Sequence, residues 1–233
     1  MIVGILVGAA LVGLAPVAAA REPARSPLSV DVVGSGPIAW PRVAVRTAPT
    51  RKARVITTLT QFRSDFRPRA LLAVRARGDG TGKPAWYQVA IPGRPNGRRG
   101  WVPAGSVTLK PVDRWLVIFR SERRFSLVLR GRVVRSGPVA IGAPGMETPL
   151  GMFFVQAMFR PTATPILGAY AFETSGYSKL SDWPGGGVVG VHGTDTPQLI
   201  GHAVSHGCVR LRNEDIVFLR TVVRVGTPVK IVA

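Results

Sequence analysis

Short apolar runs separated by Gly- and Pro-rich clusters dominate the chain from about residue 39 onward. These runs are rich in Val, Ile, Leu and Thr, a composition that is typical of β-strands joined by turns. In the first half the pattern predicts five strands, at 43–45, 55–59, 71–74, 86–89 and 100–102. Short strands packed so closely along the chain favour a small barrel, which we expect to span 39–111.

A second β-rich segment begins at Asp113. Residues 115–119 and 125–129 flank a charged turn and predict a hairpin. Further strands are expected at 133–141, 152–157, 187–191 and 227–232. One stretch has a helical pattern, with Asn213 as its N-cap and an apolar stripe made of Ile216, Val217, Leu219, Val222 and Val223. The sequence therefore predicts a mostly β protein with one short helix.

The first twenty residues are apolar and uncharged, and they end in Ala18-Ala19-Ala20 before Arg21. This pattern predicts a secretory signal peptide over 1–20. No basic residue precedes the apolar run, so an uncut membrane anchor is the alternative. Residues 21–38 are expected to form a linker. In either case we expect the body of the protein to be exported, to the cell wall or the periplasm.

The formal net charge is +19, from 31 Lys and Arg against 12 Asp and Glu. Residues 21–112 hold 17 basic and 4 acidic residues, whereas residues 113–233 hold 14 and 8. Folding does not require such an excess, so it points to anionic partners. Export argues against nucleic acid and favours anionic wall polymers, while solubility alone is the other explanation of the charge.

Chemistry concentrates in one short region. Cys208 is the only cysteine, so it cannot close an intramolecular disulfide, and all three histidines lie within positions 192–208. A thiol attacks as its thiolate, and an imidazole can accept its proton. His192 ends an apolar run, from which its ring could be aimed at Cys208. Gly207 would let a substrate approach the sulfur, with the Gly207 and Cys208 amides facing an oxyanion.

Two other interpretations of this region are open. Histidine and cysteine are zinc ligands, although the spacing of these four residues does not match a common zinc module. His206 and Cys208 would share one face of an extended segment, so a zinc site stays an alternative. A buried, unreactive Cys208 is the other. The nucleophile interpretation requires neither a metal nor a cofactor.

At this point the region resembles a known family. His192-Gly193-Thr194 followed by the run 205–211, Ser-His-Gly-Cys-Val-Arg-Leu, resembles the YkuD-type L,D-transpeptidase catalytic domain. The resemblance covers 113–233 and extends to three further motifs, at 147–153, 182–186 and 226–229. It implies a β-sandwich-like catalytic domain of mixed sheets. Residues 39–111 resemble a bacterial SH3-like domain through 45–49, 86–89 and 99–103.

The family resemblance implies a reaction on peptidoglycan stem peptides. Cys208 would attack a tetrapeptide stem after its third residue, release D-alanine and hold the stem as a thioester. An amine of a second stem would then form a 3→3 cross-link, whereas water would give L,D-carboxypeptidase activity. A non-catalytic cell-wall-binding protein is the alternative from a different class.

Residue roles are implied in the same way. His192 would be the general base and later the acid, and the carbonyl of Gly193 would orient its ring. His206 and Ser205 would shape the site. Arg210 would either pair with a substrate carboxylate or brace its loop.

Four other residues, one histidine and three aromatic residues, are expected to lie outside the set of reacting groups. His202 is expected to be a surface histidine. Tyr170, Tyr177 and Trp183 lie in the stretch where the family carries its substrate-covering loop, with core packing as the alternative for each.

Overall fold

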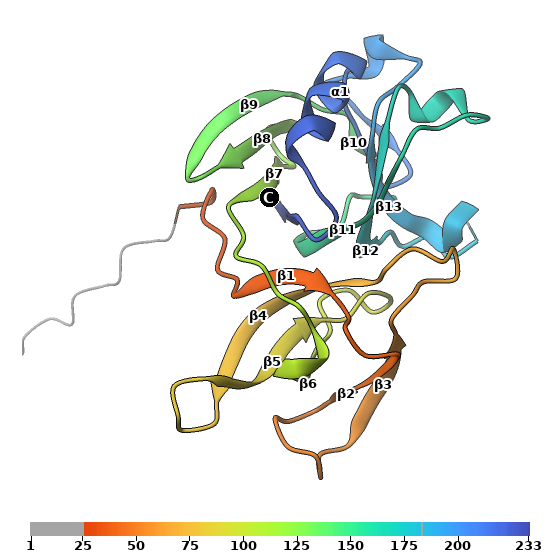
Figure 1. Ribbon diagram of the computed structural model, residues 1–233. Coiled ribbons are helices and arrows are strands. Elements are labelled where there is room, and N and C mark those ends of the chain that lie inside the picture. Colours follow the sequence, from red (N-terminus) through yellow and green to blue (C-terminus); the bar gives the residue numbers. More distant parts are fainter. Residues whose placement is uncertain (1–25, 183) are drawn as a thin grey trace, which may run out of the picture.

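The computed structural model describes residues 26–182 and 184–233. The expected signal peptide at 1–20, the start of the expected linker and Trp183 lie outside the described residues. No helix in the described part of the chain is long and apolar enough to cross a membrane. Two β-rich units follow one another along the chain and stack against each other (Figure 1).

The first unit is a six-stranded antiparallel sheet in the order β1-β4-β5-β6-β2-β3. Its strands are β1 (Gly34–Pro37), β2 (Arg42–Arg46), β3 (Val55–Thr60), β4 (Ala70–Gly78), β5 (Pro84–Ala90) and β6 (Arg99–Pro103). The one-turn helix η1 (Ala104–Ser106) follows. Alternate residues of these strands, among them Val45, Leu71, Val89 and Val102, meet in a buried core.

Five of these strands lie where the apolar pattern predicts them, and β1 does not. It falls within the segment expected to be a linker and pairs with β4, Gly34 opposite Ala73. Its sequence is Gly-Ser-Gly-Pro, which has no β-branched or aromatic residue. Only the pairing with β4 makes it a strand, so the ordered unit begins before residue 39.

The second unit is an eight-stranded mixed sheet in the order β15-β13-β12-β11-β16-β7-β8-β9. Its strands are β7 (Arg114–Phe119), β8 (Arg124–Leu129), β9 (Arg132–Pro138), β11 (Gly151–Phe159), β12 (Ala171–Tyr177), β13 (Val188–His192), β15 (Val209–Arg210) and β16 (Pro228–Val232). The pairs β16–β7 and β13–β15 are parallel. A separate parallel pair joins β10 (Ile141–Gly142) to β14 (Ala203–Ser205).

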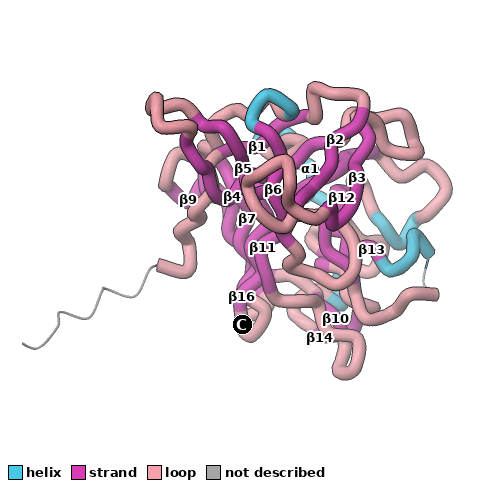
Figure 2. The backbone as a smooth tube through the Cα atoms, turned by 90° about the horizontal axis from the view of Figure 1, so that it is seen from below, coloured by secondary structure: helices cyan, strands magenta, loops and turns pink. Residues whose placement is uncertain are grey.

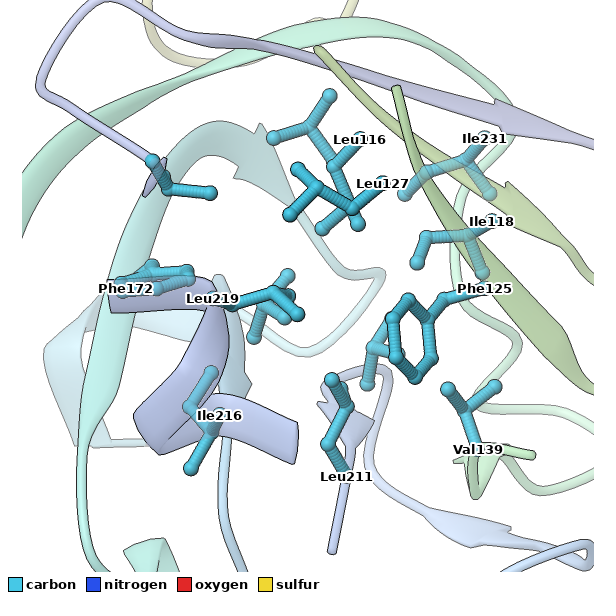
Figure 3. Close-up of a cluster of buried hydrophobic side chains, with 14 of the residues drawn as sticks. Leu116, Ile118, Phe125, Leu127, Val139, Phe172, Leu211, Ile216, Leu219 and Ile231 are labelled. Carbon is cyan, nitrogen blue, oxygen red and sulfur yellow. The ribbon is translucent and has the colours of Figure 1, made fainter. Parts of the chain in front are cut away.

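Strand β11 divides this sheet into two halves. Residues 151–154 of β11 pair with β16, and the residues from Val155 onward pair with β12. Buried side chains from both halves then meet in one core, as the close-up in Figure 3 shows for Leu116 and Phe172. The sheet thus covers both sides of its own core.

Helix α1 (Asn213–Val222) is the only α-helix in the described part of the chain. It buries Ile216 and Leu219 in the core between the two halves of the sheet (Figure 3). Val217, which we placed in the apolar stripe, is exposed instead. The mostly β fold with one short helix is confirmed, whereas the apolar pattern does not predict β12, β14 or β15.

The chain entering the first unit lies along the second one. The backbone carbonyl of Leu28 accepts a hydrogen bond of 2.6 Å from Trp115 Nε1. Lys230 Nζ donates to the carbonyls of Pro27 and Ser29, both at 2.8 Å. Seen from below, the first unit lies in front of the second (Figure 2).

Candidate active site

Parallel pairing of β13 with β15 brings the two halves of the predicted site together. Val191 lies opposite Val209, and His192 lies opposite Arg210. Side chains alternate between the two faces of a strand, and paired residues point to the same face. Val191 and Val209 enter the core. His192, Arg210 and Cys208 therefore share the other face, although sixteen residues separate His192 from Cys208 in the sequence.

The sulfur of Cys208 lies against the backbone of β13. The Gly190 amide donates a hydrogen bond to Sγ at 3.2 Å, and the thiol faces the carbonyl of Val188 at 3.8 Å. Burial raises the pKa of the Cys208 thiol, while the Gly190 amide and the charge of Arg210 act in the opposite direction. The resting group is therefore a neutral thiol next to donors and charge that favour the thiolate.

His192 is buried, with only 3% of the residue exposed. Its Nδ1 lies 2.6 Å from the carbonyl oxygen of Gly193. A carbonyl can only accept, so Nδ1 carries the proton and Nε2 keeps its lone pair. The pKa of His192 is lowered to about 4, mainly by burial and also by the charge of Arg210, while the Gly193 carbonyl opposes the shift. The imidazole is thus neutral at pH 7 and able to accept a proton.

Gly190 shows how close the ring and the sulfur are. A Cβ atom placed on Gly190 would lie 3.4 Å from His192 Cδ2 and 3.6 Å from Cys208 Sγ. Cδ2 is bonded to Nε2, so the basic edge of the ring and the sulfur border the same small space above Gly190. The absence of a side chain at position 190 keeps that space open.

The Ser-His-Gly-Cys segment forms a tight turn held by its own serine. Ser205 Oγ donates to the carbonyl of Cys208 at 2.6 Å and accepts from the Gly207 amide at 3.2 Å. Gly207 has φ +115°, and a Cβ there would lie 2.7 Å from the Cβ of Ser178. Only glycine satisfies both conditions. The Gly207 amide, which we expected to face an oxyanion, is paired with Ser205 in this structure.

Arg210 is buried behind the site. Its backbone exchanges hydrogen bonds of 2.8 and 2.9 Å with Ala140, so the strand holds it firmly. Its Nε is buried and has no hydrogen-bond partner within the described part of the protein. A buried guanidinium N–H without an acceptor is costly, which fits a group that receives an anionic ligand.

The remaining histidines differ in accessibility. His206 is half-buried in the Ser-His-Gly-Cys turn, whereas His202 is exposed. Over residues 26–182 and 184–233, no group of three or more His, Cys, Asp or Glu side chains is arranged to hold a metal ion.

Asn213 has a role that sequence reasoning missed. We expected it to cap the helix, but the N-cap is Arg212, and the Asn213 side chain bonds to other loops. Its Oδ1 accepts from the amides of Ala169 and Thr194 at 2.9 and 3.2 Å, and its Nδ2 donates to the Thr194 carbonyl at 2.9 Å. Asn213 therefore fixes the turn that carries Gly193, whose carbonyl orients His192. An Asn before a helix suggests a cap, and nothing local distinguishes the two uses.

Two of the aromatic residues of the expected covering loop make packing contacts. Tyr170 meets Phe172 edge to face, with ring centres 5.9 Å apart. Tyr177 lies under the guanidinium of Arg94, 4.9 Å from the ring centre. A cavity of about 840 Å³ opens beside Tyr177 and Ser178. Cys208 and His192 do not line it, whereas Ser178, which packs against Gly207, does.

Comparisons with known proteins identify the family of the second unit. A family model described as YkuD, L,D-transpeptidase catalytic domain, matches residues 113–231. The chain is 29% identical over 175 residues to the protein named L,D-transpeptidase YkuD of Bacillus subtilis (strain 168), covering 75% of this chain and 93% of the relative. It is 32% identical over 148 residues to the protein named L,D-transpeptidase YbiS of Escherichia coli (strain K12), covering 56% of this chain and 48% of the relative.

Among solved structures, an L,D-transpeptidase from Mycobacterium tuberculosis H37Rv aligns with a TM-score of 0.47 and 16% identity, over 86% of this chain and 98% of that one. The family match includes both strands that carry the site and spans half of the chain. The protein therefore belongs to the YkuD family of L,D-transpeptidase catalytic domains.

Proposed function

We propose that this L,D-transpeptidase forms a thioester between Cys208 and a peptidoglycan stem peptide, with His192 as the base. The observation that carries the proposal is the shared space above Gly190, bordered by the sulfur on one side and by the His192 ring on the other. The Gly193 carbonyl leaves Nε2 as the basic nitrogen, because Nδ1 lies 2.6 Å from it. A neutral base beside a protonated thiol is the resting arrangement that an acyl transfer of this kind needs.

In the acylation step, Nε2 of His192 takes the thiol proton as Sγ attacks the carbonyl carbon after the third stem residue. The negative charge moves to the carbonyl oxygen, and the Cys208 amide is our candidate donor to it. The Gly207 amide could join only by leaving Ser205 Oγ, its partner at 3.2 Å. The C–N bond then breaks, and the imidazolium returns its proton to the leaving amine of D-alanine. The stem remains on Cys208 as a thioester.

The second step regenerates the thiol. An amine of another stem attacks the thioester carbonyl, His192 accepts a proton from that amine, and the sulfur leaves and is reprotonated. The product is a 3→3 cross-link. With water in place of the amine, the product is a tripeptide and the activity is that of an L,D-carboxypeptidase.

Forming the thiolate is the demanding part of the first step, because burial raises the pKa of Cys208. The Gly190 amide and the charge of Arg210 both favour the thiolate. Because the buried sulfur is shielded from water, these two groups would act strongly on the thiolate. They would stabilise the thiolate when the proton moves to His192.

Arg210 is our candidate for holding a substrate carboxylate. Its buried Nε lacks an acceptor, and stem peptides carry carboxylates. Ser205 would act on the substrate only indirectly, since its hydroxyl already bridges the Cys208 carbonyl and the Gly207 amide. His206 would shape the rim of the same turn.

We further propose that the first unit is an SH3-like domain and that the enzyme works outside the cytoplasm on the cell wall. The basic surface that we propose for this binding consists of six exposed residues, namely Arg42, Arg51, Lys52, Arg54, Arg75 and Lys83. They would attract anionic wall polymers in a salt-sensitive manner. Retention on isolated cell walls that falls steeply between about 50 and 300 mM salt, where the Debye length shortens from about 14 to about 6 Å, would support this partner.

The nucleophile is tested by incubating the protein with a carbapenem, an acylating probe, and weighing the intact protein. We expect one covalent adduct on the wild type and none on Cys208→Ala. An adduct that persists in Cys208→Ala, or a wild type that forms none, contradicts the proposal.

The acceptor is tested separately with purified tetrapeptide stems. Cross-linked dimers would establish transfer to a second stem. Tripeptides without dimers, at any stem concentration, would instead assign the site to the carboxypeptidase reaction.

A further inference from the structure

Side chains of the first unit contact one stretch of the second unit, residues 173–182 and 184–186. Arg63 forms an ion pair of 2.7 Å with Glu173 on β12, and both side chains are largely buried. Arg94 and Asn96, from the loop between β5 and β6, hydrogen-bond to the backbone that follows. This stretch leads directly into β13, the strand that carries Gly190 and His192.

Arg94 joins the two ends of the loop that connects β12 to β13. Its Nη1 donates to the carbonyl of Gly186 at 2.8 Å. Its Nη2 donates to the carbonyls of Ser178 and Leu180 at 2.8 and 2.9 Å. The planar fork of a guanidinium suits this bridging, which a lysine ammonium cannot reproduce with the same geometry.

Asn96 hydrogen-bonds to both backbone groups of Tyr177, the last residue of β12 before the loop. Its Nδ2 donates to the carbonyl of Tyr177 at 2.7 Å, and its Oδ1 accepts from the Tyr177 amide at 2.9 Å. The first unit therefore supplies hydrogen-bond partners for the last residue of β12, which lies opposite Val188 of β13.

The loop needs outside support to hold one shape. Gly185, Gly186 and Gly187 all have positive φ, at 74°, 66° and 76°. Glycines lose more backbone entropy on ordering than other residues do. One internal bond, from the Ser178 amide to the Gly187 carbonyl at 2.8 Å, closes the loop at its base. The three bonds from Arg94 add to this closure from the first unit.

Both ends of the loop touch the turn that carries the nucleophile. Ser178 packs against Gly207 so tightly that a Cβ on Gly207 would lie 2.7 Å from the Ser178 Cβ. At the other end, the Val188 carbonyl faces the Cys208 thiol at 3.8 Å. A shift of the loop would therefore move the backbone beside the reacting sulfur.

We infer that the first unit is part of the catalytic machinery: Arg94 is a positioning residue that holds the 178–187 loop so that Ser178 fixes the Gly207–Cys208 turn. This inference rests on the proposed role of Cys208 as nucleophile. It assigns the first unit a task beyond wall binding, because its loop at 92–97 would set the geometry in which the oxyanion forms.

The test compares Arg94→Ala with Arg77→Ala, a matched loss of one positive charge from an exposed position of the same unit. Two reactions of Cys208 are timed in each full-length variant. Acylation by a carbapenem passes through an oxyanion and depends on the Gly207–Cys208 turn. Alkylation by iodoacetamide forms no oxyanion and depends on the ionisation of the thiol, which His192, the Gly190 amide and Arg210 favour.

We expect Arg94→Ala to acylate about tenfold more slowly, which corresponds to about 1.4 kcal/mol in the barrier, with alkylation within about twofold of the wild type. Hydrogen exchange in peptides covering 178–187 should become faster. Arg94→Lys should recover part of the acylation rate, and Arg77→Ala should match the wild type. Asn96→Asp keeps the acceptor for Tyr177 and loses the donor, so it should show a smaller defect of the same kind.

Three results would overturn the inference: unchanged acylation in Arg94→Ala, an equal fall in acylation and alkylation, or unchanged exchange in the loop. If Arg94→Ala does not fold, Asn96→Asp decides between the same outcomes. A wild type that forms no adduct at Cys208 would contradict the proposed function instead, so the two failures are distinguishable.

Discussion

The backbone amide of Gly190 donates to the sulfur of Cys208 at 3.2 Å, across the parallel pair of β13 and β15. The nucleophile is thereby held by the strand that also carries its candidate base. An amide that donates a hydrogen bond to the sulfur favours the thiolate form of the cysteine over the thiol. This contact ties the reactivity of Cys208 to the register of two strands.

Gly190→Ala should separate folding from reactivity. The new Cβ would meet His192 Cδ2 and Cys208 Sγ at 3.4 and 3.6 Å, which are ordinary contact distances, so the protein should fold. The methyl group would nevertheless occupy the space that a substrate carbonyl must enter, and we expect acylation to fall at least about tenfold. Gly105→Ala, whose Cβ would meet the Trp40 ring at an ordinary contact distance of 3.8 Å, is the control. Wild-type acylation rates in Gly190→Ala would show that the substrate enters elsewhere.

His192→Ala should lower the acylation rate by about 10²–10⁴-fold, the range typical of a lost general base. His202→Ala should leave it unchanged, because His202 is exposed and outside the site. Rates are measured from adduct formation in the intact protein. Equal losses in the two variants would mean that the base is wrongly assigned.

The fall in the acylation rate at acidic pH should begin at a lower pH than it would with an ordinary histidine as the base. Since the pKa of His192 is lowered to about 4, the base stays neutral at pH 5 and acylation there should be within about twofold of its value at pH 7. A histidine with the ordinary pKa of about 6.5 would give about a thirtyfold loss over the same interval. Such a loss would place the ring in water, against the burial described here.

The same burial makes stability depend on pH. Between pH 6.5 and pH 4 the unfolded chain binds a proton at His192, whereas the folded protein leaves the imidazole neutral. The free energy of unfolding should therefore fall as the pH falls through this window. The full loss from this residue is about 3 kcal/mol at most. His192→Gln should lack this part of the decline in thermal unfolding midpoints. Parallel curves for the variant and the wild type would contradict the lowered pKa.

Gly207→Ala and Gly145→Ala together isolate the contact with Ser178. Both glycines have positive φ, at +115° and +83°, but a Cβ on Gly145 would meet nothing within 4 Å. Both variants should therefore bear backbone strain, and Gly207→Ala should lose a further 1–3 kcal/mol (about the cost of overpacking) in denaturant unfolding. If both variants lose the same free energy of unfolding, Ser178 can move away from the new methyl group without destabilising the protein.

Asn213→Ala should weaken the turn that orients His192. It removes two acceptor contacts and one donor contact, and we expect a loss of about 1–2 kcal/mol in the free energy of unfolding together with slower acylation. Asn213→Asp keeps the acceptor oxygen for Ala169 and Thr194 and should be milder in both measurements. If Ala and Asp behave alike, the donor to the Thr194 carbonyl is the contact that matters.

Several features follow from local patterns alone. Nearly continuous apolar runs identify β7 and β8, because a strand buried on both faces needs apolar residues at successive positions. The strands β12 and β15 escape the same reasoning for opposite reasons: β12 is interrupted by Glu173 and Thr174, and β15 is only two residues long. Both exist because neighbouring strands supply their hydrogen bonds, which is information that no local window contains.

The sequence by itself determined which atoms can react: one thiol, three imidazoles and the motif that resembles an L,D-transpeptidase, because the nature of a side chain is a local property. Tertiary structure decided what they do together. Pairing of β13 with β15 placed His192 and Cys208 on one face, burial made the imidazole neutral, and Asn213 reached across to the Gly193 turn. The support of the 178–187 loop by Arg94, from a unit more than eighty positions earlier in the chain, is likewise a long-range contact. Such contacts are set by how sheets pack and register, and therefore only the folded chain reveals them.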